Sequence, residues 1–173
     1  FIGWLDRNGQ GQTAAALRAA GDANTGSVIG GMPTVWKNLV SQGRITDDMQ
    51  RAFIVENNVQ PAYESLPPAL KKAIDADPRL ANALYSTAVQ HGSSGAVRLF
   101  ESAAKTAKTP EQFIHNLQEM RKGDLPSSST QVRQDLASRF DRERDMLIAG
   151  GGPQAQPSQQ PLANVSTAAQ GQP

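Results

Sequence analysis

Signals that begin and end α-helices recur along most of the chain, whereas the strict alternation of a half-buried β-strand does not appear. Thr109 to Gln112 has the form of a capping box, and Asp77 places a capping acceptor directly before a first-turn proline. Gly43, Gly92 and Gly123 each follow apolar residues spaced three and four apart, as glycines at helix C-termini do. The pattern predicts an all-α fold, a bundle of about seven short helices.

The apolar stripes of these helices predict the core, which is thin. The clearest stripes are Leu80, Leu84 and Thr87, then Phe113, Ile114 and Leu117, then Val132, Leu136, Phe140 and Leu147. Aromatic residues are only 5% of the chain, and much of the apolar share is alanine, which buries little area per residue. The composition therefore fits either a close-packed bundle of short helices or part of a larger domain.

The charges divide the chain into two parts. All 17 Lys and Arg and all 16 Asp and Glu lie at or before Asp145, so residues 150–173 carry no charge. This end is built from Gly, Pro, Gln, Ser and Ala, which cannot bury enough surface to offset the entropy of ordering. We expect a helical lobe over 1–149 and an extended or disordered tail over 150–173. The tail is either a linker or a segment that docks on neighbouring subunits.

Several classes of chemistry find no support in the residues present. The chain has no Cys and only two His, His91 and His115, without a His-Glu-x-x-His spacing, so we expect no metal site and no cofactor. Ser93 and Ser94 beside His91 suggest helix caps rather than a serine triad. The glycines from Gly26 to Gly31 follow no expected strand and precede no Gly-Lys-Ser, so a phosphate-binding loop is not expected either.

Glycoside hydrolysis needs two carboxylates about 5–10 Å apart, and no such pair stands out. The available acids are Asp6, Asp22, Glu56, Glu64 and Glu101, most of which are explained by caps or exposed helix faces.

The arginines of the last predicted helix are neutralised by its acids, and the formal net charge is +1, so specific nucleic-acid binding is not expected. No apolar run approaches the ~20 residues that span a bilayer, so no membrane span is expected.

Three segments nevertheless carry a family resemblance: Arg51-Ala52-Phe53-Ile54, Pro61-Ala62-Tyr63 and the run from Ala83 to Gly92. Together they resemble the C-terminal half of chitosanase-like peptidoglycan hydrolases, relatives of family 46 glycoside hydrolases, that occur in phage virion proteins and type VI secretion spike proteins. Gly95-Ala96, Phe100 and the stretch from Phe113 to Arg121 continue the match. It covers roughly 33–122, and Ser86-Thr87-Ala88-Val89-Gln90-His91-Gly92 is its most specific part.

The resemblance implies a lysozyme-like helical fold and peptidoglycan glycan strands as the ligand. In that family the catalytic Glu and its supporting Asp lie ahead of the matched region, near a "YG.YQ" segment that this chain does not contain. No catalytic residue is therefore carried over to this chain. Gln90 and His91 are the matched positions for a weak glycan-binding role along the sugar cleft, and they equally suit a role in capping and bracing a helix.

The leading hypothesis is a bacteriophage virion protein, either tail-associated or ejected from the capsid interior, that acts in the bacterial periplasm or cell wall. It would carry part of a muramidase-like domain, be inactive as isolated here, and contact other virion subunits through 150–173. A structural adaptor that keeps the fold without the enzyme, and a type VI secretion spike effector, are the alternatives. Because the chain starts at Phe1, we expect a processed product or a piece of a longer protein.

Overall fold

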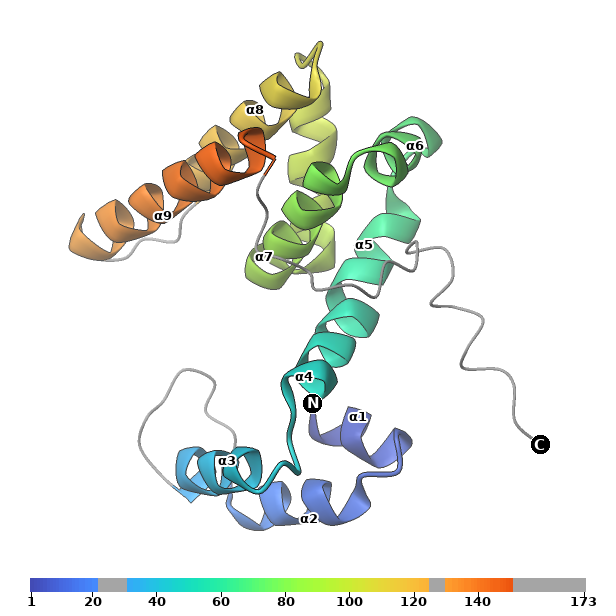
Figure 1. Cartoon of the computed structure of the whole chain (residues 1–173), viewed down its shortest axis with the longest axis vertical. Helices are drawn as coiled ribbons and strands as arrows, with labels where there is room; N and C mark the ends of the chain where they lie inside the picture. Colours follow the sequence, from blue (N-terminus) through green and yellow to red (C-terminus); the bar gives the residue numbers. More distant parts are fainter. Residues whose placement is uncertain (22–30, 125–129, 151–173) are drawn as a thin grey trace. The chain divides into compact units, whose positions relative to one another are not determined.

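A computed structural model describes residues 1–21, 31–124 and 130–150, except for the side chains of Thr130 and Val132. Within these ranges the chain forms α-helices α1 to α9 and one π-helical turn, and it forms no β-strand (Figure 1). The all-α prediction is therefore confirmed. The tail predicted over 150–173 lies outside the described residues apart from Gly150. Among the described helices, none is both long and apolar enough to cross a membrane.

The chain separates into two compact units, Phe1–Glu56 and Asn57–Pro173, which we call unit 1 and unit 2. The charge and composition of the sequence suggest one lobe over 1–149, and in the structure helical residues continue without a linker from α4 into α5. The boundary falls inside the π-helical turn η1, Val55–Val59, where no Gly- or Pro-rich stretch marks it. Separate apolar cores, rather than a change in composition, create the division.

Unit 1 contains α1 (Ile2–Arg7), α2 (Gly11–Ala19), α3 (Gly31–Ser41) and α4 (Asp47–Ile54). Its core is a single apolar cluster of Trp4, Leu5, Ala14, Leu17, Leu39 and Ile45. Four aromatic rings pack along this cluster: Phe1 stacks on Trp4, and both contact the edge of Phe53, while Phe1 also touches Trp36. Apolar contact and ring packing therefore dominate this unit.

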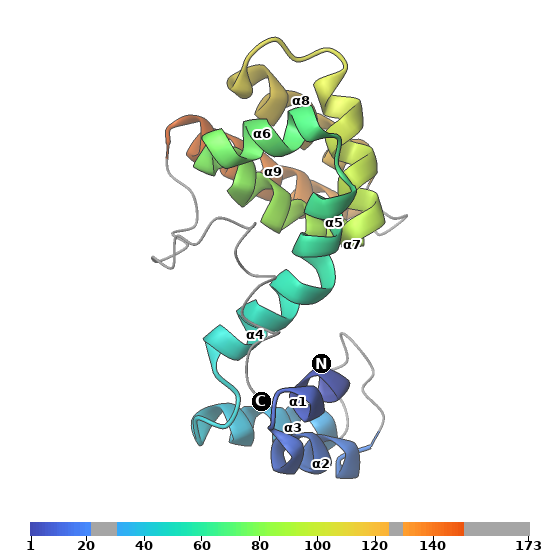
Figure 2. The same ribbon diagram turned by 90° about the vertical axis from the view of Figure 1, so that its right-hand side faces the viewer.

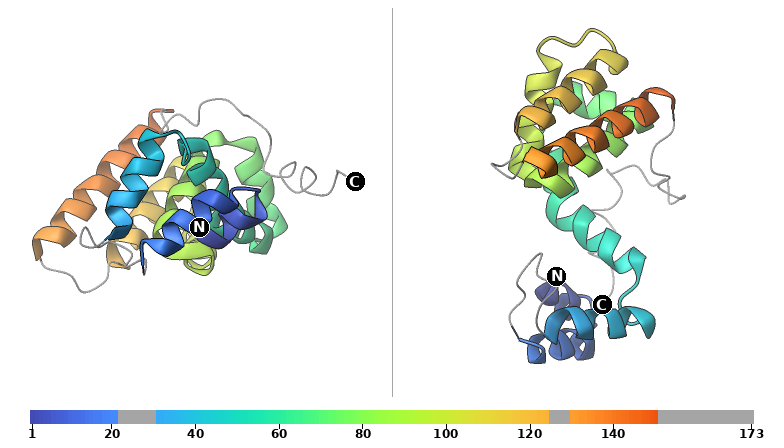
Figure 3. Two further views of the ribbon diagram at one scale, coloured as in Figure 1. Left: turned by 90° about the horizontal axis from the view of Figure 1, so that it is seen from below. Right: turned by 90° about the vertical axis from the view of Figure 1, so that its left-hand side faces the viewer.

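Unit 2 contains α5 (Gln60–Ser65), α6 (Pro68–Ala76), α7 (Pro78–Ala104), α8 (Pro110–Gly123) and α9 (Thr130–Ile148). Helix α7 packs against α5, α6 and α8, and α9 lies alongside α8, as two views turned by 90° show (Figure 2, Figure 3). Fully buried side chains from these helices include Leu84, Phe100, Ile114, Leu117, Phe140 and Leu147. Helix α7 is thus the central element of the unit.

Helix α7 bends at Gly92, which has φ 69° and ψ 176° and separates two helical segments. The sequence predicts a stop at this glycine and a restart at Ser93 or Ser94, and both features appear. A positive φ is readily adopted by glycine, whereas a side chain at Cβ would strain it. The kink positions Gln90 and His91 at the end of one segment and Arg98 on the next.

The predicted caps at Asp77 and Thr109 are confirmed. The side chains of Thr46, Asp77 and Thr109 accept hydrogen bonds from backbone N–H groups of the first turns of α4, α7 and α8. The capping box at Thr109 differs in one detail. The Gln112 amide oxygen accepts from the backbone N–H of Lys108, at 2.9 Å, rather than from that of Thr109. The amide therefore caps the residue before the expected one.

Candidate functional site

A fully buried charged group of unit 2 is the guanidinium of Arg121, on α8. Its side chain is 0% exposed, and it is the largest of the fully buried side chains. The guanidinium carbon lies 4.5 Å from the centre of the Phe140 ring on α9, within the range of a cation–π contact. A buried charge of this kind is tolerated only when most of its donors are satisfied.

Four hydrogen bonds meet that requirement and join three helices. One terminal nitrogen donates to Gln118 Oε1 at 3.0 Å and to Glu143 Oε1 at 2.8 Å. The other donates to Ser86 Oγ and to Gln90 Oε1, both at 3.0 Å. Because Ser86 and Gln90 belong to α7 and Glu143 to α9, Arg121 links α7, α8 and α9. We call these five residues the Arg121 network.

The structure places the two predicted binding residues at the edge of this network. Gln90 accepts from Arg121, so its side chain is turned toward the interior and braces α7 against α8. His91 Nδ1 lies 3.3 Å from a carboxylate oxygen of Asp124, and its Nε2 is buried without a hydrogen-bond partner. Burial, and to a lesser extent the charge of Arg121, lowers the pKa of His91. His115 is exposed on α8, as expected from the sequence.

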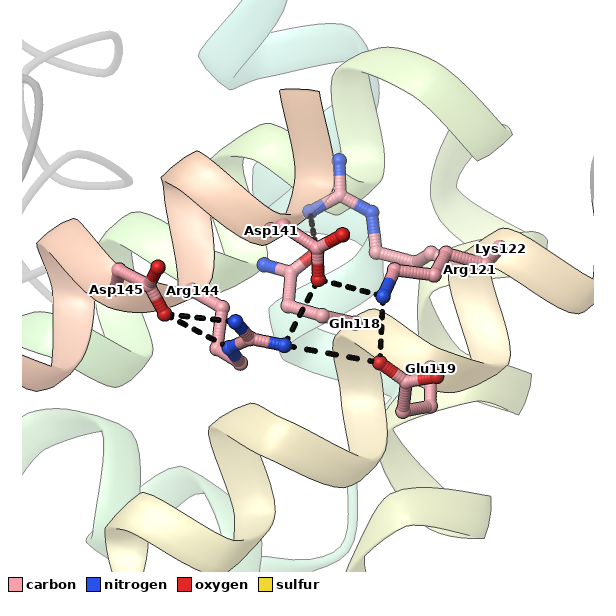
Figure 4. Close-up of polar contacts among 7 residues, drawn as sticks. All are labelled: Gln118, Glu119, Arg121, Lys122, Asp141, Arg144 and Asp145. Atoms are coloured by element: carbon pink, nitrogen blue, oxygen red, sulfur yellow. Dashed lines mark hydrogen bonds and ion pairs between the residues drawn. The ribbon is translucent and has the colours of Figure 1, made fainter. Parts of the chain in front are cut away.

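A second polar group lies on the surface between α8 and α9, next to the buried one (Figure 4). Lys122 contacts Glu119 and Asp141, each at 2.6 Å, and Arg144 contacts Asp141 and Asp145, each at 2.8 Å. The hydrogen bond from Lys122 holds the pKa of Asp141 below its usual value. Exposed pairs contribute little individually, so this network chiefly fixes how the two helices align.

Unit 2 also contains an open pocket of about 430 Å³ between α5 and the second segment of α7. Its wall carries two cations, Arg98 and Lys105, and one carboxylate, Glu101. Four hydroxyl groups complete the polar lining: Ser65, Ser93, Ser94 and Ser102. Neither Gln90 nor His91 is among the lining residues, so the structure does not bring the predicted binding residues into this pocket.

The acids weighed as catalytic candidates do not form a pair. Asp6 pairs with Arg18, Glu56 accepts from Trp4, and Glu64 accepts from Gln60, whereas Asp22 lies outside the described residues. Glu101 alone of these lines the pocket. The described part of the chain therefore offers one carboxylate at the pocket, where acid–base cleavage of a glycoside needs two. In the same ranges, no three His, Asp or Glu side chains gather closely enough to hold a metal ion.

Sequence reasoning missed both the central role of Arg121 and the pocket. A signal for Arg121 exists, because it follows Leu117 by four residues and so continues the buried stripe of α8. No comparable signal exists for the pocket, because its two walls are about thirty residues apart in the sequence and meet only through packing. Comparison of the chain with protein-family models, curated proteins and solved structures finds no match.

Proposed function

We propose that this chain is part of a phage virion-associated protein and supplies the non-catalytic helical lobe of a peptidoglycan-degrading, muramidase-like domain. The lobe holds the glycan strand, and the acid–base couple lies outside the residues described. The chain then serves cell-wall penetration in the bacterial periplasm. The family resemblance supplies the virion context and the choice of polymer.

One observation carries the proposal. Ser86 and Gln90, from the most specific part of the resemblance, hold the buried Arg121, which itself ends the matched region. Residues of the resembling segments therefore contribute to the interior of unit 2, together with Phe140, Glu143 and Leu147 of α9. The lone carboxylate at the pocket supports the second part of the proposal, which is that this lobe binds glycan without cleaving it.

The test uses residues 1–173 and purified peptidoglycan sacculi. We expect the protein to sediment with sacculi and to release no soluble fragments, because the described residues place only one carboxylate, Glu101, at the pocket. R121Q, which destabilises unit 2, should weaken the sedimentation, and R133Q, which changes an exposed arginine of α9, should keep it. Lysis by the wild-type chain would contradict the non-catalytic role, and a failure to sediment would contradict glycan binding.

A structural adaptor is the second candidate, and the state of the acids favours it. Among the described carboxylates, all but Asp48 and Glu101 have an ion-pair partner or a hydrogen-bond donor, and these two lie in different units. Acids engaged in this way stabilise a fold rather than transfer protons.

The gene sequence encoding the residues before Phe1 separates the candidates. A Glu followed by a "YG.YQ" segment supports the muramidase, its absence supports the adaptor, and a long β-helical spike domain supports a secretion effector.

A further inference from the structure

The pocket between α5 and α7 is lined by charged, hydroxyl and apolar groups. Four of its polar groups, Ser94, Arg98, Glu101 and Lys105, follow one another by three or four residues along α7 and its C-cap. Pro61 of α5 and Val97 of α7 add an apolar patch. The volume of about 430 Å³ lies within the usual range of small-molecule sites, which is about 300–1,000 Å³.

The two cations of the pocket are not equivalent. Arg98 already donates to the Asp124 carboxylate at 2.6 Å, so its charge is largely compensated. Lys105, at the C-terminal end of α7, has no ion-pair partner among the described residues. Lys105 is therefore the group that a ligand anion would contact, through a charge-assisted hydrogen bond.

Glu101 restricts which hydrogen-bonding groups a ligand in this pocket can carry. It too has no hydrogen-bond or ion-pair partner among the residues that the structure describes, although it lies one helical turn from Lys105. The side chain is exposed, and an ionised carboxylate accepts hydrogen bonds and donates none, so a ligand held against it would bring N–H or O–H donors. A phosphate ion brings mostly negative charge and is repelled by Glu101. A neutral sugar brings donors but leaves Lys105 without an anion.

We propose that this pocket binds a sugar that carries a carboxylate. The ring's apolar face packs on Pro61 and Val97, its hydroxyl or amide groups donate to Glu101 and exchange hydrogen bonds with the serines, and its carboxylate accepts from Lys105. This inference deepens the proposed function and rests on it, since a lactyl-bearing amino sugar of the glycan strand is one ligand of this chemistry.

The experiment is an NMR titration of residues 1–173 with two matched pairs of ligands. Glucuronate is compared with glucose, and N-acetylmuramic acid with N-acetylglucosamine, so that each pair isolates the carboxylate. We expect the acidic member to bind more tightly in both pairs and to shift the amide signals of Ser93, Ser94 and the Glu101–Lys105 turn. K105Q should weaken that binding roughly ten-fold, as the loss of one charged hydrogen bond does.

K108Q is the control, since Lys108 is also exposed and lies three residues beyond Lys105 but outside the pocket. Equal binding of the neutral and acidic sugars, tighter binding of inorganic phosphate or of free alanine, or an equal effect of K108Q would each overturn the inference. If glucuronate binds but sacculi do not, the pocket stands and the proposed function fails. If sacculi still bind K105Q as tightly as wild type, the pocket assignment fails and the proposed function stands.

Discussion

Each of the two units has an interior stabilised by a different kind of interaction. Unit 1 surrounds an apolar cluster with four aromatic rings, and its main polar link is the 2.6 Å hydrogen bond from Trp4 Nε1 to Glu56. Unit 2 encloses the charge of Arg121 within its interior, where the two terminal nitrogens donate to residues of three helices and the buried Nε has no hydrogen-bond partner. Apolar contacts are non-directional and tolerate small shifts, whereas hydrogen bonds to a fixed guanidinium admit one alignment of the helices.

The difference indicates which unit is built for precise geometry. A buried charge network contributes less to stability than an apolar core of equal volume, but it penalises every arrangement that leaves a donor unpaired. Helix α7 supplies Ser86 and Gln90 to the Arg121 network. Farther along the chain, Arg98, Glu101 and Lys105 line the pocket. The network therefore fixes the first segment of α7, and the proposed ligand site lies on the second segment, beyond the kink at Gly92.

The largest expected effect comes from breaking the Arg121 network. R121Q leaves the Glu143 carboxylate buried without its cation, and we expect a loss of about 3–5 kcal/mol in the free energy of unfolding of unit 2. Urea unfolding followed by hydrogen exchange of the α7 and α8 amides measures it. R121M combined with E143L should recover part of the loss, because no charge is then left buried alone. A loss below about 1 kcal/mol for R121Q would contradict the assigned role.

An apolar truncation should have a comparable effect in unit 1. Leu5 is 0% exposed, so L5A should cost about 2–5 kcal/mol through lost contacts and an unfilled cavity. Both tryptophans of the chain, Trp4 and Trp36, lie in unit 1, so urea unfolding followed by tryptophan fluorescence reports on this unit. V40A, at a site that is 39% exposed, is the control, with an expected change within about 0.5 kcal/mol.

Matched helix caps provide a smaller test in each unit. The hydroxyls of Thr46 and Thr109 both accept a backbone N–H at 3.2 Å, so T46A and T109A should each cost about 1 kcal/mol. T46A should act on the fluorescence transition of unit 1 and T109A on the exchange of the α8 amides. T34A, in the body of α3, removes a threonine without removing a cap. If both cap variants acted on the same unit, the division of the chain at Glu56 would be contradicted.

The smallest expected effect is a pH dependence that belongs to unit 2. Burial lowers the pKa of His91, with Arg121 and Arg98 adding to the shift and Asp124 opposing it, so the folded state favours the neutral ring. The unfolded chain then binds more protons as pH falls through the ordinary histidine value of about 6.5. Stability is full above that pH and decreases below it, until the folded state also becomes protonated. H91Q should flatten this decrease in a melting-temperature series, and H115Q should not.

Helix boundaries were the most predictable part of this protein, because their signals are local. A cap such as Asp77 or Thr109 acts within three residues, and a glycine such as Gly92 adopts positive φ at little steric cost. The role of Gln90 was only half predictable. The sequence allows a glycan contact or a brace, and which of the two applies depends on where α8 lies. The structure turns this side chain to Arg121.

The amino-acid sequence by itself determined the all-α class, the helix caps and the buried stripes, since these depend on residues within one or two turns of each other. Only the tertiary structure decided that the chain divides inside η1, that Arg121 is the interior charge of unit 2, and that Ser65 faces Ser93 across a pocket. The physical reason is the separation along the chain between the residues that interact. A helix forms from neighbours in sequence, whereas a core, a buried charge network and a pocket form from residues that only packing brings together.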